Sequence, residues 1–254
     1  MTPDPIAFSI AGFDIRWYGI LIATGMMLAM LVIYKRAPRH GIDPDKMIDL
    51  CLITIPVAVV GTRLYYVFSN WDYYQGDFMK IIDMRAGGLA IHGGLITGVL
   101  TALILARIWH IRPLNLLDLG MPAVALAQSI GRWGNYFNQE AYGTPTDLPW
   151  AIDIDGTMVH PTFLYESIWC FMLFLLLSYL DRHRRFEGQI FLLYGILYSF
   201  ERFFVEWLRT DSLMIGPFKT AQLVSCIIFV TFSAAYWLMK RKAGRNADLH
   251  FHIK

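Results

Sequence analysis

The sequence predicts an all-α polytopic membrane protein with seven transmembrane helices, its N-terminus periplasmic and its C-terminus cytoplasmic. Composition is the first reason: 56% of the 254 residues are hydrophobic, only 17% are charged, and the mean hydropathy is +0.44. A soluble domain is about 25% charged. The second reason is that seven stretches reach roughly the 20 apolar residues needed to cross a bilayer. The third reason is the one-sided distribution of cations between those stretches.

Composition also excludes several classes of protein. A net charge of +2 is too balanced for a nucleic-acid-binding protein. The three cysteines, Cys51, Cys170 and Cys226, are too few and too far apart for a disulfide framework or a zinc site. No two histidines have the i, i+4 spacing of a helical zinc motif. We therefore expect no zinc site.

The seven predicted spans differ in how continuous their apolar residues are. The first, third and seventh are uninterrupted. Arg63 lies in the second, and Arg202 and Glu206 lie in the sixth. The fourth has the weakest span signal, because it is short and carries Asp118 and Gln128. Asp118 could be only a helix-start charge. The spans lie near residues 17–34, 47–68, 89–109, 115–132, 161–180, 188–208 and 219–239 of a single membrane domain, with external loops at 69–88 and 133–160.

Loop charges give the orientation. Fourteen of the 22 lysines and arginines fall on one side of the predicted membrane, which is the cytoplasmic side by the positive-inside rule. The cytoplasmic cations are Lys35, Arg36, Arg39, Lys46, Arg107, Arg112, Arg182, Arg184, Arg185, Lys240, Arg241, Lys242, Arg245 and Lys254. The outer side has Arg16, Lys80, Arg85, Arg209 and Lys219, and it also collects most of the loop aspartates.

The densest polar cluster, GRWGNYFNQEAYG at 131–143, lies where the fourth span emerges on the outer side. Arg132 presents a planar fork of donors suited to phosphate, and the amides of Asn135 and Asn138 add neutral donors and acceptors. Its glycines allow close backbone approach to a ligand. A polar ligand site is one interpretation. The alternative is an interfacial loop in which Arg132 and Glu140 only pair with each other.

Ionisable groups inside a bilayer each need a partner or a function, because their insertion costs at least ~2.5–3.5 kcal/mol. Tyr198, Arg202 and Glu206 are spaced i, i+4, i+8 and share one face of the sixth span. Arg202 and Glu206 could simply neutralise each other, or Arg202 could also reach a ligand. Glu201, the residue before Arg202, lies about 100° round the helix from it, and its role stays open.

His92, in GGLAIHGGLITG at 87–98, is the only histidine inside a predicted span. A neutral imidazole can accept a proton near neutral pH, as thiol or hydroxyl chemistry requires. The alternative is a hydrogen-bonded packing residue. Gly94 and Gly98 have the spacing of a close helix-packing pair.

Smaller polar features lie at the same outer level. Tyr18 begins the first span, Arg63 lies towards the outer end of the second, and HPTFLYE at 160–166 opens the fifth with Glu166 one turn in. The roles of Arg63 and Glu166 stay open. The intramembrane polar groups, Asp118 excepted, thus converge on the outer half of the membrane. This convergence predicts one site for an anionic ligand that enters from the lipid.

These motifs resemble those of the bacterial prolipoprotein diacylglyceryl transferase family. GRWGNYFNQEAYG at 131–143 is similar to the family signature almost position for position. WYG at 17–19, IHGG at 91–94, HPTFLYE at 160–166 and the run from Tyr198 to Arg209 follow in the family's order. One departure is Thr162-Phe163, where the family often has Ser-Gln.

The resemblance implies a multi-pass enzyme of the cell inner (cytoplasmic) membrane, with its active site towards the periplasmic leaflet. It would transfer the diacylglyceryl group of phosphatidylglycerol to the lipobox cysteine of a preprolipoprotein signal peptide, giving a thioether and glycerol phosphate. The resemblance implies catalytic roles for His92, Arg132, Arg202 and Tyr18, and phosphatidylglycerol binding by Arg132, Asn135, Asn138, Glu140, Gly143, Tyr198 and Glu206.

The residue chemistry agrees with this reaction, and no step of the reaction demands a metal or organic cofactor. His92 would accept the thiol proton, Arg132 and Arg202 would stabilise the charge on the leaving phosphate, and Glu140 and Glu206 would hold the arginines in place. A transporter using the same arginines would need a polar path to the cytoplasmic face, which the inner halves of the spans scarcely supply. A non-catalytic membrane scaffold would not need buried charges at this cost.

Overall fold

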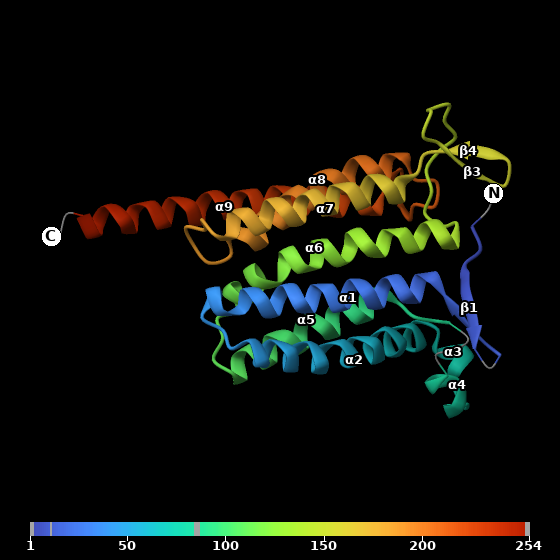
Figure 1. Ribbon diagram of the computed structural model, residues 1–254, viewed down its shortest axis with the longest axis horizontal. Helices are drawn as coiled ribbons and strands as arrows, with labels where there is room; N and C mark the ends of the chain where they lie inside the picture. Colours follow the sequence, from blue (N-terminus) through green and yellow to red (C-terminus); the bar gives the residue numbers. More distant parts are fainter. Residues whose placement is uncertain (1–2, 11, 84–86, 252–254) are drawn as a thin grey trace. The chain divides into compact units, whose positions relative to one another are not determined.

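The computed structural model describes residues 3–10, 12–83 and 87–251, and it is mostly helical (Figure 1). Arg85 and Lys254, two of the loop cations counted above, lie outside the described residues. The chain forms two compact units. The first comprises Met1–Val32 and Leu117–Lys254, and the second comprises Ile33–Leu116.

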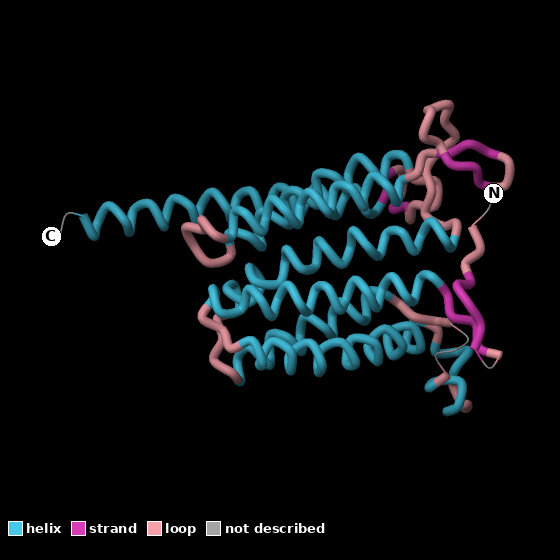
Figure 2. Tube along the Cα trace, in the orientation of Figure 1, coloured by secondary structure: helices cyan, strands magenta, loops and turns pink. Residues whose placement is uncertain are grey.

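Long helices alternate with short hairpins and turns along the chain (Figure 2). In order, the elements are β1 (Ile6–Ile10), β2 (Phe13–Arg16), α1 (Trp17–Arg36), the 3₁₀ helix η1 (Ala37–His40), α2 (Pro44–Ser69), α3 (Trp71–Tyr74), α4 (Phe78–Ile82), α5 (Ile91–Ile108), α6 (Pro113–Asn138), β3 (Ile152–Ile154), β4 (Thr157–Val159), α7 (Thr162–Asp181), α8 (Gln189–Leu208), β5 (Met214–Ile215), β6 (Phe218–Lys219) and α9 (Thr220–Phe251). The strands pair as antiparallel two-stranded sheets, β1 with β2, β3 with β4, and β5 with β6.

A long helix lies in each stretch predicted as a span. Within the site, the largest difference from the predicted bounds lies in α6. This helix continues to Asn138, through residues 133–138 that the sequence analysis assigned to an external loop. Aromatic packing keeps this part helical: the rings of Trp133 and Tyr136 contact Phe163 of α7, with centroids 5.4 and 5.0 Å apart. Consequently Arg132, Asn135 and Asn138 all project from one helix.

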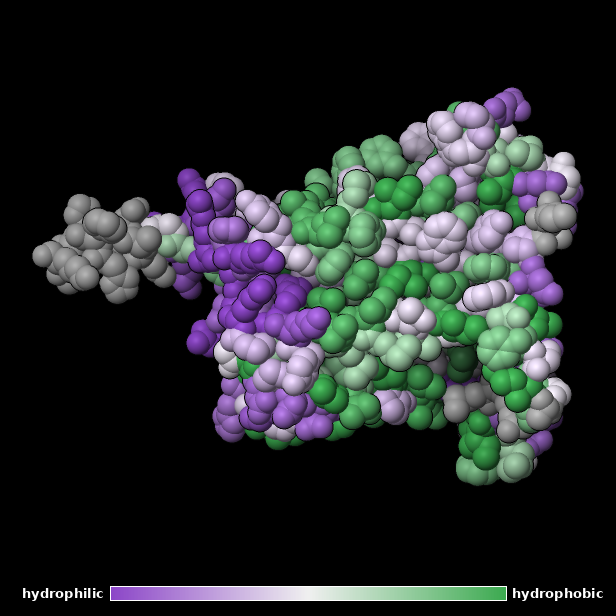
Figure 3. Space-filling model, viewed as in Figure 1, coloured by the Kyte–Doolittle hydropathy of each residue, from purple (hydrophilic) through white to green (hydrophobic). Residues whose placement is uncertain are grey.

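Five of the described helices are long and apolar enough to cross a membrane: Trp17–His40, Pro44–Ser69, Ile91–Ile108, Thr162–Asp181 and Thr220–Arg245. Large apolar side chains such as Met27, Val60, Val99 and Val230 are exposed on these helices, as expected of surfaces that face lipid. Figure 3 shows apolar residues along the flanks of the helices and hydrophilic residues gathered towards their ends. The protein is therefore a polytopic membrane protein.

The first unit is built around α6, α7 and α8. Its buried core contains Ala125 of α6, Leu173 and Leu177 of α7, and Ile190 of α8. Helix α9 packs on α8 at Gly195, where a Cβ atom would lie 2.2 Å from the Phe232 ring. This close approach requires glycine, and it holds α9 against the helix that carries Tyr198 and Arg202.

The second unit is built on the packing of α2 against α5. The two backbones come close together at Gly61 and Gly93, because a Cβ on Gly93 would lie 2.2 Å from the Gly61 carbonyl oxygen. The sequence analysis expected Gly94 and Gly98 to make the close contact. A Cβ on Gly94 would lie 2.6 Å from Thr62 Cγ2, whereas one on Gly98 would make an ordinary contact 3.5 Å from Ala58 Cβ. The tight small-residue interface is therefore shifted towards the start of α5.

Candidate active site

A buried carboxylate lies between two arginines in the first unit. Glu166, on the second turn of α7, is 1% exposed and forms an ion pair with Arg132 of α6 through Oε2. Its Oε1 accepts a hydrogen bond from Arg202 Nη1 of α8 at 3.4 Å. Three helices thus meet at one charge cluster. The sequence analysis left the role of Glu166 open, and its position one turn into an outer-half helix was the only available signal.

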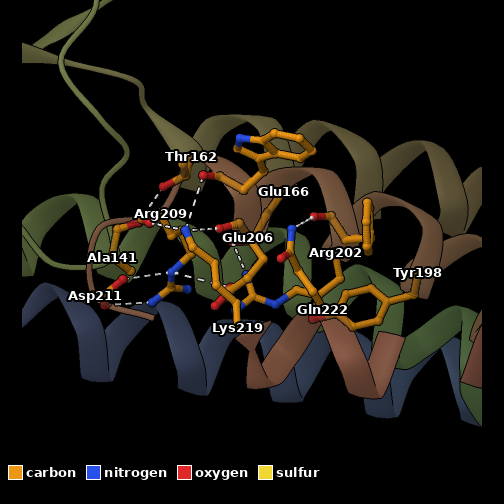
Figure 4. A network of polar contacts seen from close by, with 12 residues as sticks. Ala141, Thr162, Glu166, Tyr198, Arg202, Glu206, Arg209, Asp211, Lys219 and Gln222 are labelled. Atoms are coloured by element: carbon orange, nitrogen blue, oxygen red, sulfur yellow. Dashed lines mark hydrogen bonds and ion pairs between the residues drawn. The ribbon is translucent and has the colours of Figure 1, made fainter. Parts of the chain in front are cut away.

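A second carboxylate, Glu206, pairs with Arg202 along α8. Arg202 Nη2 lies 2.7 Å from Glu206 Oε2, as the i, i+4 spacing predicted, and Arg209 Nε lies 3.9 Å from the same oxygen. Figure 4 shows Arg202, Glu206 and Arg209 in one network with Glu166. The intrahelical pair therefore does not stand alone, because Arg202 also contacts Glu166.

Burial within this cluster is uneven, and the difference has a chemical consequence. The side chains of Arg132 and Arg202 remain 22% and 18% exposed, whereas those of Glu166 and Glu206 are only 1% and 3% exposed. The buried carboxylates therefore hold two arginines whose side chains remain partly exposed. Such an arrangement suits an oxyanion or phosphate ligand, because the donors are already oriented before the ligand arrives.

Tyrosines connect α6 and α8 in the same region. Arg132 Nη2 donates to Tyr198 Oη at 3.3 Å, and Tyr194 Oη one turn earlier donates to Gln128 Oε1 at 2.8 Å. The rings of Tyr194 and Tyr198 are stacked with centroids 5.6 Å apart and an interplanar angle of 5°. Tyr198 therefore lies at the arginine cluster.

The amides of the 131–143 motif converge on a different carboxylate. Asn135 Nδ2 and Asn138 Nδ2 donate to Glu140 Oε1 at 2.9 and 3.3 Å. The sequence analysis expected Glu140 to hold an arginine, but the contacts assign that role to Glu166 and Glu206. Spacing along the chain could not distinguish these partners, because Glu166 reaches Arg132 only through the packing of α7 on α6.

Gly143 ends the motif beside the C-terminal end of α8. Its N–H donates to the His160 carbonyl at 3.0 Å, and it forms an antiparallel bridge with Arg209. A Cβ at this position would lie 2.7 Å from His160 Cβ. The close approach explains why this position needs glycine, and it ties the end of the motif to Arg209.

Arg209 is the C-cap residue of α8, and it forms a bidentate ion pair with Asp211. Arg209 Nε and Nη2 donate to the two Asp211 carboxylate oxygens at 2.9 and 2.7 Å. These hydrogen bonds from the guanidinium lower the pKa of Asp211 below its usual value. Asp211 is therefore ionised at neutral pH.

Tyr18 packs directly on α6 at Gly134. A Cβ on Gly134 would lie 2.3 Å from Tyr18 Cδ2, so the tyrosine ring occupies the space that any other side chain would fill. The neighbouring Trp17 stacks on Phe137 with ring centroids 5.2 Å apart. The start of α1 is thus fixed against the last turns of α6, beside Asn135.

Thr162-Phe163, the pair that departs from the family's usual Ser-Gln, packs against the 131–143 motif. Thr162 Oγ1 donates to the Ala141 carbonyl within the 131–143 motif. Phe163 is buried against Trp133 and Tyr136 rather than presenting a polar group. This part of the site is therefore held by aromatic packing and one hydroxyl.

His92 lies in the first turn of α5, in the second unit. Its side chain is exposed, and its ring lies 6.2 Å from the Tyr65 ring between centroids. The described contacts place it beside α2 of the same unit. The arginine cluster belongs to the first unit, and the role of His92 as the base stays a prediction.

Arg63 is buried beneath the segment that precedes α5. Its guanidinium donates to the carbonyls of Lys80 at 2.6 Å, Ile81 at 2.9 Å, Gly87 at 2.8 Å and Gly88 at 3.0 Å. The cation also lies 5.0 Å from the Tyr74 ring centroid. Arg63 therefore organises the α3–α4 segment and the entry to α5, close in sequence to His92.

Within the described ranges, no group of three His, Cys, Asp or Glu side chains is arranged to hold a metal ion. The groups gathered in the first unit are instead guanidinium donors, carboxylates, amides and a phenol. This set can bind an anion and stabilise negative charge that develops on it.

Comparison with known proteins gives one consistent result. The family model for prolipoprotein diacylglyceryl transferase matches residues 5–239. The chain is 53% identical over 228 residues to the phosphatidylglycerol–prolipoprotein diacylglyceryl transferase of Finegoldia magna, covering 89% of this chain and 92% of that protein. It is 48% identical over 246 residues to the enzyme of the same name from Clostridioides difficile, covering 96% and 98%. Similarity at this level over nearly the whole chain shows that the protein belongs to the prolipoprotein diacylglyceryl transferase family.

Proposed function

We propose that this protein transfers the diacylglyceryl group from phosphatidylglycerol to the lipobox cysteine thiol of a preprolipoprotein, forming a thioether and releasing glycerol phosphate. Membership of the family supports this reaction. The observation that carries it structurally is the pair of partly exposed arginines, Arg132 and Arg202, held together by the buried carboxylate of Glu166.

The chemistry needs a thiolate and a stabilised leaving group. The cysteine sulfur attacks the phosphate-bearing carbon of the diacylated glycerol, a carbon–sulfur bond forms, and the bond between that carbon and the phosphate oxygen breaks. The electron pair of the broken bond moves onto the phosphate oxygen, so negative charge increases there. Arg132 and Arg202 offer donors to that charge. The loss of one comparable donor in other enzymes costs ~2.7–4 kcal/mol of activation free energy.

The proton of the thiol must be removed, because the thiolate is the nucleophile and a free cysteine has a pKa near ~8.5. His92 is our proposed acceptor, directly or through a water molecule. This role rests on the IHGG motif at 91–94 and on the chemistry of a neutral imidazole.

The remaining motif residues would orient the lipid head group. Asn135 and Asn138 share the Glu140 carboxylate, which leaves one Oδ1 acceptor on each amide for the glycerol hydroxyls. Tyr18 flanks the same end of α6, and Gly143 keeps the backbone close to Arg209. Phosphatidylglycerol and other membrane lipids would enter from the bilayer.

We infer that the chain crosses the cell inner (cytoplasmic) membrane seven times as one membrane domain, with the N-terminus periplasmic and the C-terminus cytoplasmic. The one-sided distribution of lysine and arginine supports this topology. Helices α6 and α8 would complete the seven spans, and their charged side chains pair with other helices of the unit, as polar groups in a membrane must. The arginine cluster would then lie towards the periplasmic leaflet.

The direct test uses purified protein, phosphatidylglycerol and a synthetic lipobox peptide. The proposal predicts that the cysteine peptide gains the mass of one diacylglyceryl group, whereas a Cys→Ser peptide gains none. A peptide that gains no mass, or an equal gain on both peptides, would refute the transferase assignment. The transporter alternative predicts movement of lipid without any covalent change in the peptide.

A further inference from the structure

Helix α8 carries three residues of the site, Tyr198, Arg202 and Glu206, yet its own sequence does not cap its N-terminus. The N-cap residue is Gly188, with φ 89°, and no side chain of the flanking segment accepts a hydrogen bond as a cap. The first N–H groups of an α-helix have no intrahelical partner, and they must be satisfied elsewhere when they are buried.

Asp118 of α6 supplies these partners from another helix. Its Oδ1 accepts hydrogen bonds from the N–H groups of Ile190 at 2.9 Å and Phe191 at 3.0 Å. Its Oδ2 accepts from Gly188 N–H at 2.7 Å and from Arg184 Nη1 at 3.2 Å. The Asp118 side chain is 0% exposed. A carboxylate is the charge that the N-terminal end of a helix dipole favours.

The opposite end of α8 is held in the complementary way. Lys219 Nζ donates to the carbonyls of Glu206 at 2.8 Å, Trp207 at 3.2 Å and Arg209 at 2.6 Å. These carbonyls lie at the C-terminal end of the helix, where a cation is favoured. A buried anion from α6 and a cation from β6 therefore fix the two ends of α8 (Figure 4 shows the Lys219 end).

Between these anchors, α6 and α8 are joined by contacts in a constant register. Gln128 bonds Tyr194, and Arg132 bonds Tyr198, and each pair is separated by 66 positions in the sequence. A shift of α8 by one residue would move the Tyr198 hydroxyl by about 1.5 Å along the axis. A displacement of about 1 Å in a site residue can lower a reaction rate about 100-fold.

We propose that Asp118 is a positioning residue for the transfer reaction: it anchors α8 to α6 so that Arg202 and Tyr198 are held at Arg132. Asp118 lies about 21 Å from Arg132 along α6, at 1.5 Å per residue, so it does not touch the reacting atoms. This inference rests on the proposed transferase function. It assigns a role to Asp118, an intramembrane acid that lies away from the outer half.

A purely structural Asp118 and a positioning Asp118 predict different results for Asp118→Asn. The amide keeps the shape of the side chain but loses the charge and replaces one acceptor with a donor. If Asp118 only stabilises the fold, the variant loses thermal stability and folded fraction, and the folded molecules keep their kcat. If it positions α8, the folded molecules have a kcat at least tenfold lower while KM for peptide and lipid stays within twofold.

A spin-label distance tests the helix position without requiring activity. Labels at Val124→Cys on α6 and Phe204→Cys on α8 occupy exposed positions, and Cys226→Ser removes the one exposed native thiol, since Cys51 and Cys170 are buried. We expect Asp118→Asn to shift or broaden this distance distribution relative to the same labels on otherwise native protein. A failed transfer assay with native protein would refute the proposed function. The distance measurement would still test whether Asp118 anchors α8 to α6.

The matched control is Arg184→Gln, which breaks the same ion pair from its more exposed side and leaves the three backbone donors on Asp118. It should keep kcat within about twofold. Native kcat and an unchanged distance in folded Asp118→Asn would overturn the proposal. If Asp118→Asn does not fold, Lys219→Met decides: a lower kcat at constant KM with an altered distance supports the anchoring of α8, and native values of both overturn it.

Discussion

Arg132 and Arg202, on α6 and α8, share a single buried carboxylate, Glu166 of α7. Each guanidinium is therefore held by a buried carboxylate, while the arginine side chain as a whole stays partly exposed. Glu166 and Glu206 together match the charge of the two arginines. What this geometry offers a leaving phosphate is therefore a set of oriented guanidinium donors rather than a net positive charge.

The first prediction concerns Glu166→Gln. The amide cannot neutralise two guanidinium groups, so Arg132 and Arg202 should separate and lose their common orientation. We expect kcat for peptide lipidation to fall about 100-fold or more, which is the size of losing one preorganised charge-stabilising contact. Mass spectrometry of the peptide measures the rate. Asp72→Asn, an exposed acid in α3, should transfer at the native rate. Equal rates in the two variants would show that Glu166 is dispensable.

A second prediction tests His92 as the proton acceptor. His92→Gln preserves polarity and approximate size but cannot accept and hold the thiol proton as imidazole does. The transfer rate at neutral pH should fall, and a peptide whose cysteine is already ionised at higher pH should recover part of it. Near-native transfer by this variant at neutral pH would exclude His92 as the base and would indicate that the arginines alone ionise the thiol.

A third prediction uses two glycines of α6 that differ only in their surroundings. Gly134→Ala places a methyl group 2.3 Å from Tyr18 Cδ2, so the tyrosine and the start of α1 must move, whereas Gly120→Ala meets no atom within 4 Å. We expect Gly134→Ala to destabilise the protein by about 1–3 kcal/mol and to lower transfer. Gly120→Ala should be neutral or stabilising by up to about 1 kcal/mol. Thermal unfolding in detergent compares them, and equal stabilities would contradict the described packing.

A fourth prediction follows from the lowered pKa of Asp211. Because the pair with Arg209 lowers this pKa in the folded protein, its contribution to stability is present above the ordinary aspartate pKa of about 3.9 and is lost as pH falls through the lower folded value. Asp211→Asn should therefore be less stable than native protein at pH 7, and the difference should shrink below about pH 4. A difference in melting temperature that stays constant from pH 7 to pH 3 would contradict this assignment.

Local periodicity was sufficient for much of this architecture. The long apolar stretches predicted where helices form, and the i, i+4 spacing predicted the Arg202–Glu206 pair. These features depend on residues one turn apart, so the sequence contains them directly. The 131–143 motif also indicated a polar site, although it identified Glu140 rather than Glu166 as a partner of an arginine.

Partners from separate helices could not be predicted in this way. Glu166 reaches Arg132 and Arg202 only because α7 packs beside α6 and α8. Asp118 resembled a helix-start charge of α6, yet it caps α8, and its partners follow it by about 70 positions. No spacing rule connects residues at such separations. The buried carboxylates were therefore the part of the site that required the structure.

The most direct test of the central claim is the kcat of Arg132→Lys with phosphatidylglycerol and the lipobox peptide. Lysine keeps the positive charge but lacks the planar fork that contacts Glu166 and Tyr198 and leaves further donors for phosphate. If the arginines stabilise the leaving phosphate by oriented hydrogen bonds, kcat should fall about 100-fold or more while the protein remains folded. Native kcat in a folded Arg132→Lys enzyme would contradict the account, because a point charge would then be sufficient.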